Sequence, residues 1–177
     1  MAEPAWRLVT YRLAAEPSRH RVAVWRELRH AGAVALQQAT WAVPAGEGFD
    51  EAVDRAVALV DRGEGTAFVF DVVPSAETGP ALVAVYSQAR EEEWIEFLAE
   101  CDKFAGEIAG EIAKEKFTLA ELDEEEHNLE RLRRWHRQIR ARDLFGARSA
   151  QAAERRLKAC VEALEDYAQR VFDARGR

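Results

Sequence analysis

The chain has 177 residues, with 32 acidic and 25 basic side chains and a formal net charge of −7. This negative total argues against attraction of the whole molecule to nucleic acid, although the field over a single face can still favour it. No apolar run approaches the roughly 20 residues that cross a bilayer, and no signal peptide is evident at the N-terminus. We therefore expect a cytoplasmic protein without a membrane partner.

The first quarter of the chain predicts a strand followed by a helix. Loose alternation of apolar residues favours a strand over residues 6–13. Residues 18–30 predict a helix, with Ser18 as its N-cap. Val22, Trp25 and Leu28 recur at helical spacing, so we expect them to form the buried stripe of this helix, with Trp25 as a core anchor.

Two further stretches complete an α/β pattern. Residues 34–44 predict a strand, which residues 37–39 interrupt as either a hairpin turn or a bulge. A helix is expected over residues 49–62 and a core strand over residues 66–73, which are rich in β-branched and aromatic side chains. The order strand, helix, one or two strands, helix, strand is typical of a ferredoxin-like βαββαβ fold, which we place at residues 1–74.

The second half predicts an antiparallel bundle of about three helices, which we place at residues 79–173. Residues 81–86 suit either a short strand or the start of a helix, and the helix is preferred. Thr118 and Glu121 have the spacing of a capping box. Ser149 is expected to cap the last helix. The predicted fold class is therefore α+β, a ferredoxin-like half followed by a helical bundle.

No catalytic motif is recognisable in the sequence. GxSxG, Walker, GxGxxG and HExxH patterns are absent, so we predict no catalytic residue, no cofactor and no enzyme activity. Glu124 and His127 have the ExxH spacing of di-iron bundles, but this motif occurs once and such sites need it twice, so we predict no metal site. Cys101 and Cys160 are expected to be buried free thiols. One alternative function is a redox reaction or the binding of an oxyanion, by these thiols or by clustered arginines.

Two arginine-rich stretches are the candidate nucleic-acid-binding surfaces. Arginine binds phosphate through its planar guanidinium fork. For residues 19–29 the alternative is an ordinary solvated helix face. For residues 131–142 it is ion pairing with residues 91–93, Glu154 or Glu165. The candidate residues are Arg19, Arg21, Arg26, Arg29, Arg131, Arg134 and Arg137.

Several short pieces of the sequence form a recognisable set. They are Ser18-Arg-His-Arg21 with Trp25-Arg26, Gly32-Ala-Val34, Leu36-Gln37 with Trp41 and Pro44, Glu100-Cys101, and Arg142-Asp143-Leu-Phe-Gly146. With these pieces the chain resembles the N-terminal region of ChrB-type chromate-resistance regulators, and the resemblance extends over nearly the whole chain. The pattern over residues 21–44 is also similar to the Cas2-like module of PaaX-type repressors.

The resemblance implies a function in chromate-responsive control of a chromate efflux operon. It implies DNA as a partner, a homodimer, and the chromate oxyanion as an effector. Full-length regulators of this type continue with a second domain. A protein-interaction module that docks on a partner supplying that domain is therefore the second alternative.

Overall fold

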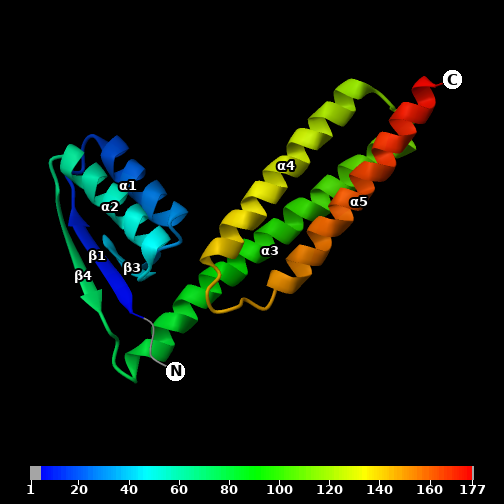
Figure 1. The fold of residues 1–177 in the computed structure, drawn as a ribbon. Coiled ribbons are helices and arrows are strands. Elements are labelled where there is room, and N and C mark those ends of the chain that lie inside the picture. The colour runs from blue at the N-terminus through cyan, green and yellow to red at the C-terminus, as the bar shows by residue number, and fades with distance from the viewer. Residues whose placement is uncertain (1–4, 177) are drawn as a thin grey trace. The chain divides into compact units, whose positions relative to one another are not determined.

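The computed structural model describes residues 5–176, and the chain divides into two compact units, Met1–Tyr86 and Ser87–Arg177. The first unit holds the sheet with two helices, and the second is entirely helical (Figure 1). In chain order the elements are β1 (Trp6–Arg12), α1 (Ser18–His30), β2 (Val34–Gln37), β3 (Thr40–Pro44), α2 (Glu47–Arg62), β4 (Thr66–Val72), α3 (Thr78–Ala113), α4 (Leu119–Arg142) and α5 (Ala150–Arg175).

The first unit has the predicted ferredoxin-like arrangement. Its four strands form an antiparallel sheet in the order β2-β3-β1-β4, and α1 and α2 cover one face (Figure 1). The core between helices and sheet is made of small and branched apolar side chains: Val9, Val24, Leu28, Trp41, Val43, Val53, Ala56 and Val60. The βαββαβ reading of the sequence is thus confirmed.

The β2–β3 connection contains both features that the sequence left open. Gln38 and Ala39 form a two-residue hairpin turn in which Ala39 has a φ of 61°. The pairing also shifts between Ala35 and Gln37, so Leu36 is an extra residue in β2. Such a bulge leaves one residue unpaired and bends the strand. The turn lies beside the end of β1, because the Tyr11 amide donates to the Ala39 carbonyl at 3.1 Å.

The buried stripe predicted for α1 is wrong at two of its three positions. Leu28 is buried, but Val22 and Trp25 are exposed, Trp25 to 46%. The helix instead buries Val24 and Leu28, which are four residues apart and therefore lie on one face. Two apolar series overlap in this short helix, and packing on the sheet selects one of them. Trp25 is consequently not a core anchor.

The core strand predicted at residues 66–73 is an edge strand. β4 pairs with β1 alone, and Phe68 and Phe70 are 59% and 51% exposed. These two residues lie on the same face of the strand because side chains alternate. Their rings stack with centroids 6.4 Å apart. β-branched and aromatic composition identified the strand correctly, but composition carries no information about a strand's place in the sheet.

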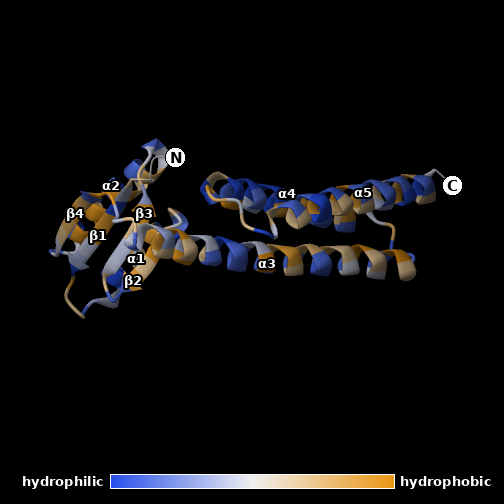
Figure 2. Ribbon diagram, turned by 90° about the horizontal axis from the view of Figure 1, so that it is seen from below, coloured by the Kyte–Doolittle hydropathy of each residue, from blue (hydrophilic) through white to orange (hydrophobic). Residues whose placement is uncertain are grey.

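The second unit is the predicted three-helix bundle. Successive helices run in opposite directions (Figure 1), and α4 is mostly hydrophilic with hydrophobic positions spaced along it (Figure 2). Helix is also the observed state of residues 81–86, at the start of α3. The bundle core consists of Trp94, Phe97, Cys101, Phe104, Ile108, Leu122, Leu129, Leu132, Ile139, Ala153, Cys160, Leu164, Tyr167 and Val171.

Of the three predicted helix caps, the one at Thr118 is confirmed and the other two are wrong. The Thr118 hydroxyl accepts a hydrogen bond from the Glu121 amide at 3.3 Å, as expected of a cap. Ser18 is the first residue of α1, after Pro17, and Ser149 makes no side-chain cap. Ser149 has a helical backbone, with φ of −80° and ψ of −9°, and not the extended conformation of a capping residue. Its hydroxyl donates to Glu91 at 2.6 Å. Among the helices of residues 5–176, none combines the length and apolarity that crossing a membrane requires.

Candidate nucleic-acid interface

The exposed side of α1 concentrates four of the seven candidate arginines. Arg19, Arg21, Arg26 and Arg29 are all exposed. Within residues 5–176, none of the four forms an ion pair with a carboxylate. The Arg29 guanidinium lies 5.3 Å from the centroid of the Trp25 ring, a cation–π contact that leaves its hydrogen-bond donors available. The helix therefore presents unneutralised positive charge to solvent.

The charge of α1 stays unneutralised because its one acidic residue is engaged elsewhere. Glu27 accepts a hydrogen bond from Arg55 of α2 at 2.7 Å. On β1, Arg7 does not add to the positive charge of α1, since it pairs with Asp71 at 3.0 Å and Asp50 at 3.2 Å. Arg12, at the other end of β1, is exposed and makes no ion pair with any described carboxylate.

The α4 arginines lie in the second unit and are more nearly neutralised. Arg137 pairs with Glu130 at 3.1 Å, and Arg131 lies 3.9 Å from Glu100. Of these three candidates, only Arg134 has no ion pair within the described part of the chain. Nearby in sequence, Arg142 pairs with Glu93 at 3.2 Å, one of the neighbouring-helix pairings foreseen for this stretch. The structure thus favours α1 over α4 as the cationic surface.

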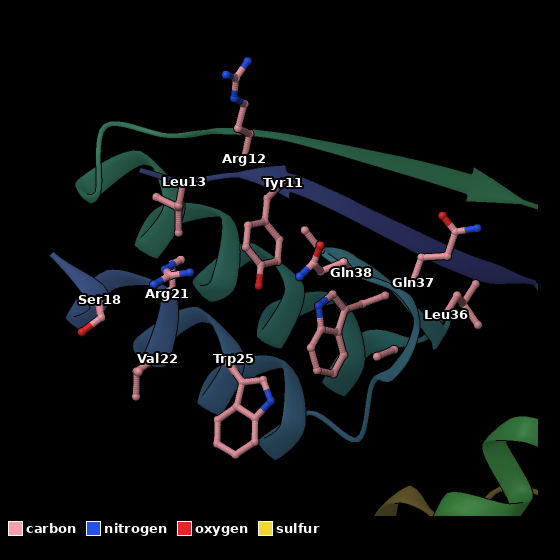
Figure 3. Close-up of a pocket in the computed structure, with 13 residues that line it drawn as sticks. Tyr11, Arg12, Leu13, Ser18, Arg21, Val22, Trp25, Leu36, Gln37 and Gln38 are labelled. Atoms are coloured by element: carbon pink, nitrogen blue, oxygen red, sulfur yellow. The ribbon is translucent and has the colours of Figure 1, made fainter. Parts of the chain in front are cut away.

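A cavity of about 820 Å³ opens beside α1, at the end of β1 and the β2–β3 turn (Figure 3). Tyr11, Arg21, Trp25, Gln38 and Trp41 are among the residues that line it. Only Arg21 was recognised from the sequence. Trp25 was expected in the core, and the residues of the turn were noted only as a break in a strand. No sequence signal joins them, because β1, α1, β2, β3 and the turn between β2 and β3 all contribute.

The thiols and the ExxH motif do not form a chemical site. Cys101 and Cys160 are both buried, and the Cys160 thiol donates to the Cys101 carbonyl oxygen at 3.5 Å. Hydrogen bonding with Cys160, together with burial, raises the pKa of the Cys101 thiol, which disfavours the reactive thiolate. His127 contacts the Asp123 carbonyl of its own helix. The described residues contain no group of three or more His, Cys, Asp or Glu side chains arranged to hold a metal ion.

The Arg142–Gly146 segment, one of the pieces that carried the family resemblance, has a structural role. The Asp143 carboxylate is buried and accepts hydrogen bonds from Trp94 Nε1 at 3.0 Å and from the Ala147 amide at 3.0 Å. Gly146, with a φ of 73°, supplies the left-handed turn between α4 and α5. This segment therefore holds the bundle together and is not a catalytic centre.

Comparison with known proteins identifies a family. No curated protein matches the chain. The family model described as "Protein ChrB, N-terminal" matches residues 21–177, which include α1 from Arg21 onwards, strands β2, β3 and β4, and the whole bundle. The chain belongs to the family of ChrB N-terminal domains, which is associated with chromate resistance.

Proposed function

We propose that this protein is a DNA-binding regulator of a chromate efflux operon and that α1 supplies its phosphate contacts. The observation that carries the proposal is the set of four exposed α1 arginines without a carboxylate partner among the described residues. Most hydrogen bonds between proteins and DNA go to phosphate and sugar, and arginine is well suited to them. Family membership supports the link to chromate resistance.

The proposal predicts a measurable salt dependence. Each phosphate that an arginine neutralises releases counterions, so log K falls against log salt with a slope of about −0.9 per contact. If all four α1 arginines reach phosphate, the slope is about −3.6 for each bound chain. Because the net charge of −7 repels DNA, a slope of this size has to come from local cationic groups, and variants of the α1 arginines test whether these four supply it.

Fluorescence anisotropy with the labelled duplex upstream of the operon, between about 50 and 200 mM salt, tests this. The double variant Arg21→Ala/Arg26→Ala should weaken binding and reduce the slope by about two units. Arg156→Ala/Arg170→Ala is the matched control, because it removes two positive charges that are already paired with Asp102 and Asp166. A flat salt response, or equal losses with the control, would contradict the proposal.

We also propose that the protein acts as a homodimer joined through the open face of its sheet. Phe68 and Phe70 form an exposed stacked pair on the face opposite to α1 and α2. On this same face, Leu8, Val72, Leu82 and Val85 help to line an almost wholly apolar groove of about 390 Å³. Two copies that each carry −7 repel one another, so an uncharged surface is where they approach at least electrostatic cost.

Light scattering coupled to gel filtration tests the dimer. The wild-type protein should have the mass of two chains, and Phe68→Ser/Phe70→Ser should have the mass of one. Phe172→Ser is the control, since Phe172 is an exposed aromatic residue in the other unit. A monomeric wild type, or a double variant that stays dimeric, would overturn this part of the proposal.

A further inference from the structure

The cavity beside α1 combines flat aromatic walls with a few polar groups. Its volume of about 820 Å³ lies within the range of roughly 300–1,000 Å³ that is usual for small-molecule sites. In Figure 3 the Tyr11 ring points from the end of β1 toward α1, where Trp25 lies, and the Gln38 amide lies beside Tyr11. Arg21 and Ser18 bound the cavity on the α1 side.

Trp41 contributes its ring, and not its polar atom, to the cavity. The residue is 7% exposed and lines the cavity. Its Nε1–H is buried without an acceptor among the described residues and has almost no exposed surface. A ligand in the open cavity would therefore contact the Trp41 ring and not this donor.

The lining is better matched to an organic anion than to a small inorganic one. Arg21 is the one cation directed toward the cavity among its lining residues, since the Arg12 guanidinium points away in Figure 3. A single guanidinium can bind one edge of an anion, but the aromatic and amide remainder of the lining has no match in a small inorganic ion such as chromate or sulfate. Four oxygens around one atom would also leave the aromatic walls in contact with water. A flat ring with one anionic substituent would fill the cavity and contact both the aromatic rings and the Arg21 guanidinium.

We propose that this cavity binds one nucleotide unit, with the base against the aromatic side chains and the phosphate on Arg21. Stacking of bases on aromatic rings is worth about 1–3 kcal/mol per base. Glutamine reads adenine through its amide, so Gln38 makes an adenine base the preferred occupant. The inference goes beyond duplex binding by the α1 arginines and does not depend on it. The unit comes either from free nucleotide or from an unpaired strand.

Titration calorimetry with the whole chain tests the site with four ligands: AMP, adenosine, inorganic phosphate and a short single-stranded oligo(dA). AMP should bind at least tenfold more tightly than adenosine or phosphate alone. Equal affinity for AMP and oligo(dA), per site, identifies free nucleotide as the source, and at least tenfold tighter oligo(dA) identifies a strand. Phosphate, sulfate or chromate binding as tightly as AMP would overturn the proposal, and so would binding of none of them.

Variants of the cavity residues test whether the ligand binds in this cavity. Gln38→Ala removes the amide that reads the base, and Tyr11→Leu removes one aromatic wall while keeping an apolar side chain, so each should weaken AMP binding at least fivefold. Neither should change affinity for the duplex, which separates failure of this site from failure of the α1 interface. Gln151→Ala, at an exposed position in the other unit, is the control. If AMP binds both cavity variants as it binds the wild type, the nucleotide site is elsewhere and the inference is wrong.

Discussion

The Glu27 carboxylate of α1 accepts a hydrogen bond from Arg55 Nε of α2 at 2.7 Å. This pairing turns the one acidic side chain of α1 toward its neighbouring helix and leaves the arginines of α1 without an internal partner. The pair is partly exposed, so its contribution to stability is small, about 0.2–1 kcal/mol. Its larger effect is on the charge that α1 presents to solvent.

Replacing Glu27 should therefore tighten DNA binding. Glu27→Gln removes a negative charge beside the proposed phosphate contacts, and we expect a few-fold higher affinity at low salt that disappears at high salt. The cost in stability should stay below about 1 kcal/mol. Glu51→Gln, which removes a carboxylate of α2 that also lies near Arg55 at 3.9 Å, is the control. Equal tightening by both variants would show that net charge, and not the α1 surface, is responsible.

Asp143 should be among the most sensitive positions of the bundle. Asp143→Ala leaves the buried Trp94 Nε1–H and the Ala147 amide without their acceptor, which should cost about 2–3 kcal/mol. Urea denaturation measures this loss, and Asp143→Asn, which keeps one oxygen acceptor, should lose less. Asp166→Ala breaks only an exposed pair with Arg170 and should cost less than about 1 kcal/mol. Similar losses for Asp143→Ala and Asp166→Ala would refute the role assigned to Asp143.

Gly65 should not tolerate a side chain. A Cβ atom there would lie 2.5 Å from the Arg12 carbonyl oxygen and 2.7 Å from a Leu13 methyl group, so the backbone would have to move. We expect Gly65→Ala to destabilise the first unit by about 1–3 kcal/mol in thermal unfolding. Gly48→Ala places its Cβ in open space within α2 and should stabilise by about 0.5–1 kcal/mol. If Gly65→Ala is as stable as the wild type, the contact between the end of β1 and the α2–β4 connection is less tight than these distances indicate.

His136 should make the bundle sensitive to acid. Burial lowers the pKa of His136, while Glu154 opposes the shift and Arg140 and Arg137 support it. Its folded pKa thus lies below the unfolded value of about 6.5. The unfolded state binds the proton first as the pH falls, so stability is complete above about pH 6.5 and is lost as the pH falls through the folded pKa.

Denaturation at a series of pH values between about 7.5 and 5 measures this loss, and His136→Gln should reduce it. The ring lies 5.1 Å from that of Trp94 and 5.5 Å from that of Phe97, so a charge there is poorly solvated. His127→Gln, at an exposed position on the same helix, is the control. An unaltered acid response in His136→Gln would assign the sensitivity to other groups.

The two thiols should resist alkylation in the folded protein. Hydrogen bonding with Cys160 and burial raise the pKa of Cys101, and both side chains are closed to solvent. Iodoacetamide should label them at least a hundredfold more slowly than in urea. Ala109→Cys adds an exposed thiol on α3 as an internal standard. Labelling of Cys101 or Cys160 at the rate of that standard would restore the redox alternative for these residues.

The sequence by itself determined the order of the elements and the interior of the bundle. In α5 the core residues, from Ala153 to Val171, recur at helical spacing in the sequence, because a long amphipathic helix has a single apolar face. The ferredoxin-like order followed from alternating strand and helix patterns. The seven candidate arginines were also visible in the sequence, but whether each is paired was not.

Only the tertiary structure decided which surfaces are covered. The short helix α1 carries two overlapping apolar series, and contact with the sheet chose Val24 and Leu28 over Val22 and Trp25. The place of β4 at the edge exposed Phe68 and Phe70. Glu27 and Arg55 are 28 positions apart, and no local pattern joins them. Periodicity describes the faces of one element, whereas burial, neutralisation of charge and cavities arise where separate elements meet.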